Sequence, residues 1–131
     1  MRKRLEEARV ARLATVDGAG KPHIVPITFV LYGEVLLFAV DDKPKRTRDL
    51  KRLRNIAANA QVSVLVDHYD DDWSKLWWVR ADGPAHVIED QAGTKRAIDL
   101  LARKYTQYER KRPQGPVVTI TIEHMTGWSP A

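Results

Sequence analysis

Short runs of apolar and β-branched residues recur along the chain and predict strands, because alternating apolar and polar positions match the two-residue period of a half-buried strand. The runs cover residues 10–16, 23–31, 35–40, 61–66, 76–88 and 117–122. The turns Asp17-Gly18-Ala19-Gly20 and Tyr32-Gly33-Glu34 separate the first three runs. Turns of this kind join antiparallel strands, so these three runs are expected to form a meander.

Two prolines modify the expected strands. Pro26 lies inside the second run and has no N–H to pair, which predicts a bulge or an edge position there. Asp82-Gly83-Pro84 interrupts the longest run and predicts a bulge.

Three segments have helical spacing instead. Residues 5–9 predict a short helix, and residues 45–58 place Leu50, Leu53 and Ile56 on one face with Lys and Arg around them. A further helix is predicted to begin after Asp90 as its cap and to end at residues 112–116. Its expected packing face consists of Thr94, Ile98, Leu101 and Tyr105.

The order of these elements predicts an antiparallel β barrel or sandwich with flanking helices. Strands that follow one another through short turns argue against a parallel βαβ sheet. The chain has 131 residues, which predicts a single domain over residues 1–131.

Composition narrows the class of protein. The 44% hydrophobic and 30% charged content is that of a soluble globular protein, with no apolar run long enough to cross a bilayer. The charged start of the chain lacks the features of a secretory signal, so a cytoplasmic location is expected. The absence of cysteine excludes disulfides, thiolate catalysis, iron–sulfur clusters and cysteine-ligated zinc.

Positive charge is concentrated in one part of the chain. The formal net charge is +5, and between residues 43 and 54 Asp49 is the only acidic residue. This balance favours an anionic partner, for which nucleic acid and a polyanionic cofactor both qualify. Nucleic-acid binding has only the net charge in its favour, because the basic helix carries no interleaved aromatic residues.

The segment Asp42-Lys43-Pro44-Lys45-Arg46-Thr47-Arg48 is the clearest candidate binding site. Four cations and a hydroxyl lie at and just before the start of the predicted helix, and the N–H groups at a helix start favour phosphate. A phosphorylated ligand is therefore expected here. The alternative is a solvated basic turn.

Three features, in this order, resemble the split β-barrel superfamily of pyridoxamine-phosphate-oxidase-like flavin and deazaflavin enzymes. The stretches 11–17 and 20–27 resemble its opening hairpin, and Lys45-Arg46-Thr47-Arg48-Asp49-Leu50 lies where that family has its phosphate-binding pair. Residues 61–66 and 77–83 resemble its next two strands. Within the superfamily, residues 43–46, 68–74 and 126–129 are similar to the F420-dependent oxidoreductases of actinobacterial type.

The resemblance implies a homodimer whose cofactors lie in grooves between the two barrels, and hydride transfer at C5 of a deazaflavin. It assigns the cofactor phosphate to Lys45 and Arg46, with Lys43, Pro44 and Thr47 beside them. It places Ile27 and Thr28 beneath the ring system and Trp78 next to it, although barrel lining and dimer packing explain these residues equally well. Val25 departs from the related oxidases, which carry an arginine there.

Other candidates have simpler explanations. Trp77 and Trp78 are neighbours on a strand, so at most one can face a ring system. His68 is a possible proton donor in a loop that is otherwise typical of solvated surface, and the four histidines lack metal-ligand spacing. Trp128 follows the last predicted strand, and an aromatic residue there indicates that the chain end is docked.

The predicted function is F420-dependent hydride transfer between the deazaflavin and a small unsaturated or carbonyl substrate, without a metal or an identified catalytic residue. One alternative keeps the fold and replaces F420 with FMN, as in an oxidase or flavin reductase. Another is a barrel that binds flavin or heme without turnover.

Overall fold

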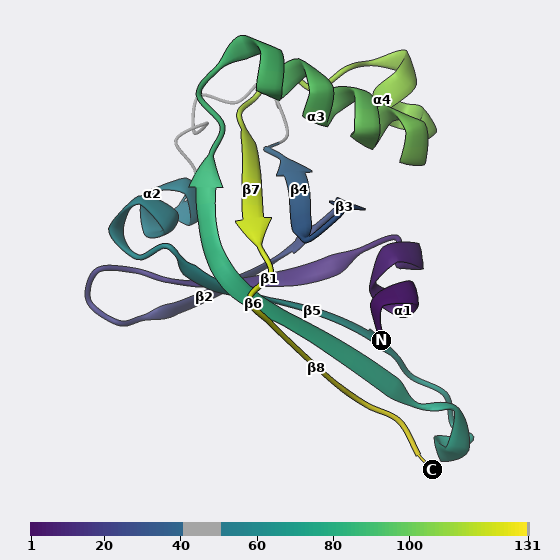
Figure 1. Ribbon diagram of the computed structural model, residues 1–131. Helices are drawn as coiled ribbons and strands as arrows, with labels where there is room; N and C mark the ends of the chain where they lie inside the picture. The colour runs from purple at the N-terminus through teal and green to yellow at the C-terminus, as the bar shows by residue number, and fades with distance from the viewer. Residues whose placement is uncertain (41–50, 131) are drawn as a thin grey trace.

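The computed structural model describes residues 1–40 and 51–130. Its strands form two antiparallel sheets that share one long strand (Figure 1). Sheet A contains β1 (Ala11–Val16), β2 (Pro22–Ile27), β5 (Gln61–His68), β6 (Trp77–Val87) and β8 (His124–Trp128). Sheet B contains β3 (Val30–Tyr32), β4 (Val35–Ala39), β7 (Val117–Thr121) and the end of β6.

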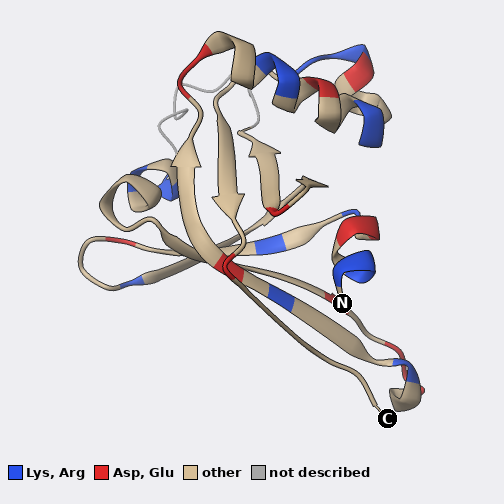
Figure 2. Cartoon of the chain, viewed as in Figure 1, with Lys and Arg blue, Asp and Glu red and all other residues tan. Residues whose placement is uncertain are grey.

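The helices lie at the edges of this β structure. They are α1 (Arg2–Glu7), α2 (Lys51–Ala58), α3 (Gln91–Lys104) and α4 (Thr106–Arg110), and a 3-10 turn, η1 (Trp73–Lys75), lies between β5 and β6. Figure 2 shows that Lys and Arg gather on the helices while the strands are mostly uncharged. No helix in the described part of the chain is long and apolar enough to cross a membrane.

The pairing of the shared strand β6 shows that the predicted bulge at residues 82–84 is wrong. Its pairing with β5 runs without interruption from Gln61 opposite Pro84 to His68 opposite Trp77, so no extra residue is inserted at 82–84. The strand passes from sheet A to sheet B at Gly83, where a Cβ atom would lie 1.8 Å from the carbonyl oxygen of Thr121. Glycine is required there because the backbones approach too closely for a side chain.

The predicted strand over residues 23–31 is two strands in different sheets. β2 ends at Ile27 in sheet A and β3 begins at Val30 in sheet B. The predicted three-strand meander is therefore wrong, although both of its turns are confirmed. β2 is an edge strand with unbroken register, which confirms the edge alternative for Pro26 and excludes a bulge.

Alternation along the strands separates a core face from an outer face. On β5, Val62, Val64 and Val66 are buried, while the residues between them face outward. The main core lies between the sheets and includes Leu13, Phe29, Phe38, Val64 and Ile120. A second cluster packs α3 on sheet B through Leu37, Ile98, Leu101, Tyr105 and Val117.

The predicted helices are present with shifted boundaries, and the one predicted from Asp90 to residues 112–116 is two helices, α3 and α4, separated by the extended backbone of Tyr105. The first covers Arg2–Glu7 rather than 5–9, and α3 begins after Asp90, whose carboxylate accepts a 2.7 Å hydrogen bond from the Gly93 N–H. The predicted helix over 45–58 is confirmed from Lys51 to Ala58, and its first residues lie outside the described part. Sequence patterns missed β8, which pairs with β6 at the end of the chain.

Candidate functional site

Two cavities contain the candidate residues that the structure describes. The tryptophan cavity, of about 530 Å³, lies on the outer face of sheet A. Its lining comes from all five strands of that sheet and includes Arg12, Ile24, Leu65, Trp78, Arg80 and Trp128. The α4 cavity, of about 460 Å³, is lined by apolar Val10, Pro26, Ile27 and Ala39 and by polar Thr28, Arg52, Tyr105, Gln107 and Tyr108.

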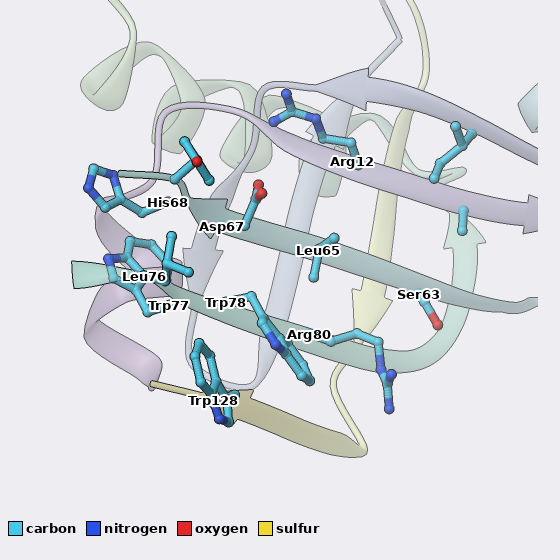
Figure 3. Close-up of a pocket in the computed structure, with 13 residues that line it drawn as sticks. Arg12, Ser63, Leu65, Asp67, His68, Leu76, Trp77, Trp78, Arg80 and Trp128 are labelled. Carbon is cyan, nitrogen blue, oxygen red and sulfur yellow. The ribbon is translucent and has the colours of Figure 1, made fainter. Parts of the chain in front are cut away.

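In the tryptophan cavity, Trp78 of β6 is the cross-strand partner of Trp128 of β8, so the two indoles lie on the same face of the sheet (Figure 3). The Arg80 guanidinium lies 6.0 Å from the centre of the Trp78 ring. Trp128 is 48% exposed and Ile24 is 66% exposed, which leaves this apolar face open in a single chain.

Trp77 also borders the cavity, but its other contacts are different. It stacks on His68 with ring centres 6.1 Å apart, and the Arg4 guanidinium lies 4.9 Å from its ring centre. The indole also packs against the main core. Both tryptophans therefore line the cavity, but Trp77 is also held by His68, Arg4 and the core.

The α4 cavity lies where the chain passes from β2 to β3. Thr28 and Phe29 lie between these strands, so their backbone groups have no place in either ladder. The Tyr105 hydroxyl accepts a 3.1 Å hydrogen bond from the Phe29 N–H. It lies 3.0 Å from the Phe29 carbonyl oxygen and 2.9 Å from that of Arg9, to which it donates. One hydroxyl thus contacts both backbone polar groups of Phe29 in this connection.

A second tyrosine continues this arrangement at the cavity wall. The Tyr108 hydroxyl lies 2.8 Å from the Thr28 hydroxyl, and the rings of Tyr105 and Tyr108 meet edge to face with centres 5.7 Å apart. The Tyr105 hydroxyl is protonated at neutral pH and can donate, and burial raises its pKa above the ordinary value. The α3–α4 junction therefore fixes Thr28 from the side opposite the strands.

A cation is packed behind the same connection. The Lys104 ammonium lies 4.1 Å from the centre of the Phe29 ring and donates a 3.2 Å hydrogen bond to the Glu6 carbonyl oxygen. Burial is the main cause that lowers the pKa of Lys104 to about 8, and the nearby charge of Arg9 contributes to this shift. The Arg9 guanidinium lies 4.6 Å from the centre of the Tyr105 ring.

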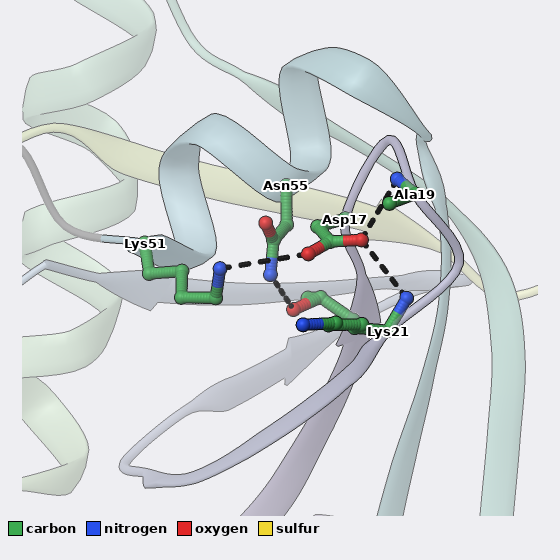
Figure 4. A network of polar contacts seen from close by, with 6 residues as sticks. Asp17, Ala19, Lys21, Lys51 and Asn55 are labelled. Carbon is green, nitrogen blue, oxygen red and sulfur yellow. Dashed lines mark hydrogen bonds and ion pairs between the residues drawn. The ribbon is translucent and has the colours of Figure 1, made fainter.

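Polar contacts tie α2 to the turn between β1 and β2 (Figure 4). Asp17 accepts 2.9 Å hydrogen bonds from the N–H groups of Lys21 and Ala19, and its other oxygen lies 3.7 Å from the Lys51 ammonium. The Lys21 N–H bond is the main cause of the lowered pKa of Asp17. The buried Asn55 donates a 3.0 Å hydrogen bond to the Thr15 hydroxyl. These contacts fix the position of α2, which also carries Arg52 of the α4 cavity.

The structure divides the predicted site residues between the two cavities. Ile27 and Thr28 line the α4 cavity, whereas Trp78 lines the tryptophan cavity, and the two linings share no residue. Lys43, Pro44, Lys45, Arg46 and Thr47 lie outside the described residues. In the sequence they fall between Ala39 and Arg52, which both line the α4 cavity.

Sequence analysis missed the tyrosines that complete the α4 cavity. Tyr105 was expected only as a packing residue, and no pattern pointed to Tyr108, because both act through residues about eighty positions earlier. Among residues 1–40 and 51–130, no group of three or more His, Cys, Asp or Glu side chains is arranged to hold a metal ion. His68 lines the tryptophan cavity and lies 4.0 Å from the carboxylate of Asp70.

The family profile described as pyridoxamine 5'-phosphate oxidase matches residues 1–129. The chain belongs to this family. Its two sheets joined by β6 are the split β-barrel fold of pyridoxamine 5'-phosphate oxidase-like proteins. A comparison with curated proteins found no match.

Solved structures share this fold. A FAD-binding protein from Mycobacterium smegmatis is 25% identical with a TM-score of 0.62, over 95% of this chain and 87% of that one. A FAD-binding protein from Mesorhizobium loti is 24% identical with a TM-score of 0.71, over 96% and 89%. The heme storage protein HutZ from Vibrio cholerae is 17% identical with a TM-score of 0.72, over 98% and 90%.

Proposed function

We propose that this protein binds coenzyme F420 with the tricyclic ring in the α4 cavity, and that it exchanges hydride between the cofactor and a small unsaturated or carbonyl substrate. The carrying observation is the composition of that cavity. Apolar residues of β2 and β4 form one wall, and hydroxyls of Thr28 and Tyr108 form another. A volume of about 460 Å³ lies in the range typical of sites for ring-sized ligands.

The basic segment gives the second argument. Lys45 and Arg46 fall in the sequence between two residues of the cavity wall, Ala39 and Arg52. A phosphorylated cofactor with its ring in the cavity therefore has cations available within a short length of chain. Arg offers a planar fork and Lys a compact charge, and both form strong contacts with phosphate.

In this proposal the bound deazaflavin supplies the hydride chemistry, and the protein supplies placement. Ile27 and Pro26 provide an apolar surface for the ring and exclude water from one side of it. Thr28 and Tyr108 orient the polar edge of the ring.

We also propose that the protein is a homodimer formed through the outer face of sheet A. The exposed Ile24 and Trp128 are apolar groups that a second copy would cover. Arg80 and Asp67 add charges of both signs to this face, so opposite charges of two copies could meet across a two-fold axis. Trp78 would then lie at the dimer interface.

A flavin is the alternative cofactor, because two structures of this fold are described as FAD-binding proteins. FMN would use the same cavity and the same basic segment. A carrier without turnover is a further alternative, since the heme storage protein HutZ shares the fold.

Titration of the protein with F420 and with FMN, followed by absorbance and fluorescence, tests the choice of cofactor. The double variant Lys45→Ala, Arg46→Ala is expected to weaken the preferred cofactor by about 2 to 5 kcal/mol, the range for losing charge-assisted contacts. The control Lys95→Ala, Arg96→Ala removes the same two charges from the exposed surface of α3 and should leave affinity unchanged. Unaltered affinity in the first variant would refute the phosphate site.

Turnover is tested by following the absorbance of the reduced cofactor with candidate acceptors. An oxidoreductase accelerates its oxidation in the presence of an unsaturated or carbonyl compound. A carrier slows the oxidation of the reduced cofactor or leaves its rate unchanged, and either result would contradict the proposed reaction.

A further inference from the structure

We infer that Tyr108, acting together with Thr28, determines specificity by donating one hydrogen bond to a carbonyl oxygen on the edge of the ring bound in the α4 cavity. This inference rests on the proposed function, because it assigns a partner to the ring in that same cavity. The ligand chemistry is a planar heteroaromatic ring with a carbonyl at its edge, which deazaflavins and flavins have in common.

Counting protons gives the first argument. The hydroxyls of Thr28 and Tyr108 lie 2.8 Å apart, so one proton is used between them. Within residues 1–40 and 51–130, neither hydroxyl has another hydrogen-bond partner, and both side chains line the cavity. The second proton of the pair is therefore available to an acceptor inside the cavity.

The rigidity of the pair gives the second argument. Tyr105 precedes Tyr108 by three residues and is tied to both polar groups of Phe29, which follows Thr28. Its ring also meets the Tyr108 ring edge to face, with an interplanar angle of 71°. Two hydroxyls from the α3–α4 junction thus hold the β2–β3 connection, and the pair keeps its geometry before a ligand arrives. A preorganised donor discriminates better than a mobile one.

The apolar wall gives the third argument, because it restricts how a ring can lie. Pro26, Ile27 and Ala39 offer no hydrogen-bonding side chain, so a flat ring packs against them and meets the hydroxyl pair with its edge. A site built around a hydrogen bond rejects ligands that lack the matching atom far more strongly than an apolar pocket does.

The test uses Tyr108→Phe and Thr28→Val, which remove each hydroxyl and keep the size of the side chain. Tyr32→Phe is the matched control, since Tyr32 is 64% exposed on β3 and does not line the α4 cavity. Each purified variant is titrated with F420 and with FMN, and thermal unfolding of the free protein is recorded alongside.

Tyr108→Phe is expected to weaken binding of the ring that wild type prefers by about 5- to 30-fold, the effect of losing one hydrogen bond to the ligand. Thr28→Val should have a similar effect. The double variant should lose less than the product of the two single losses, because the hydroxyls act as a pair. The absorption band of the bound ring should also move toward its position in free solution, which a purely structural role would not cause.

The outcomes separate this inference from the proposed function. If the wild type binds a ring and both single variants bind it with an affinity within twofold of the wild type, the role of Tyr108 is overturned. The proposed cofactor site would then remain. Equal losses in the Tyr32→Phe control would also overturn it. Absence of binding to either ring by wild type would overturn the inference together with the proposed cofactor.

Discussion

The tryptophan cavity and the α4 cavity are built by different physical means. Strand register brings Trp78 and Trp128 together, and each step of that arrangement follows from alternation along β6 and β8. The α4 cavity instead depends on hydrogen bonds from Tyr105 and Tyr108 to residues 76 and 80 positions earlier in the chain. One is a face of a sheet, and the other is a joint between a helix pair and a strand connection.

This difference separates the roles that the two cavities can have. A broad apolar sheet face with exposed Ile24 and Trp128 is suited to contact with another large surface. A smaller cavity with a fixed pair of hydroxyls is suited to recognition of one edge of a small molecule.

The largest effect is expected at Gly83, where β6 passes from one sheet to the other. A Cβ atom there would lie 1.8 Å from the Thr121 carbonyl oxygen, and backbone must move to admit it. Gly83→Ala should lower the free energy of unfolding by about 3 kcal/mol, measured by urea denaturation. Gly18→Ala is the control, because its Cβ would only touch Ala58 at 4.0 Å. Equal stability of the two variants would show that β6 is not constrained at this point.

The next effect is confined to the joint at the α4 cavity. Tyr105→Phe removes the hydroxyl that satisfies the Phe29 N–H and should cost about 1 to 3 kcal/mol, since a buried polar group loses its partner. Hydrogen exchange should show faster exchange of the Phe29 amide, with β5 and the first half of β6 unchanged. Uniform acceleration across both sheets would contradict the separation of the two regions.

A smaller effect is expected in the tryptophan cavity. Trp128→Ala removes the cross-strand partner of Trp78 and should cost about 1 kcal/mol of stability. Sedimentation equilibrium should also show weaker self-association. Trp73→Ala is the matched control, because that indole is 68% exposed on η1 and does not line the cavity. Identical behaviour of the two variants would remove Trp128 from the proposed interface.

The smallest effect is the pH dependence of stability that comes from Lys104, which packs on Phe29 of the β2–β3 connection. The pKa of Lys104 is about 8 in the folded protein and 10.5 in the unfolded chain. Above pH 8 the unfolded chain therefore binds more protons at this residue than the folded protein does. Stability from this group is therefore greatest at high pH and is lost as the pH falls through 8. Thermal unfolding between pH 7 and 10 should show the wild type gaining stability relative to Lys104→Met as the pH rises. A constant difference across that range would contradict the lowered pKa.

The sequence predicted the features of the sheets better than it predicted the contact between the α3–α4 helix pair and the β2–β3 connection. Alternation in residues 61–66 and the Asp90 cap follow local rules, and the structure confirms both. The run 23–31 reads as one strand, since local pattern does not encode the change of sheet between Ile27 and Val30.

Two further features had no local signal. β8 was missed because its short, mixed segment is a strand only through its pairing with β6. Tyr105 and Tyr108 were missed as site residues, since their partners are far away in the chain. Ile27 and Thr28 came from family resemblance, and the structure shows that both line the α4 cavity.

A crystal structure of the protein with F420 tests the central claim most directly. The account predicts the ring in the α4 cavity, with a carbonyl oxygen within hydrogen-bond distance of the Tyr108 or Thr28 hydroxyl and the phosphate next to Lys45 and Arg46. A ring bound in the tryptophan cavity of a single chain, with the phosphate remote from residues 43–48, would contradict it.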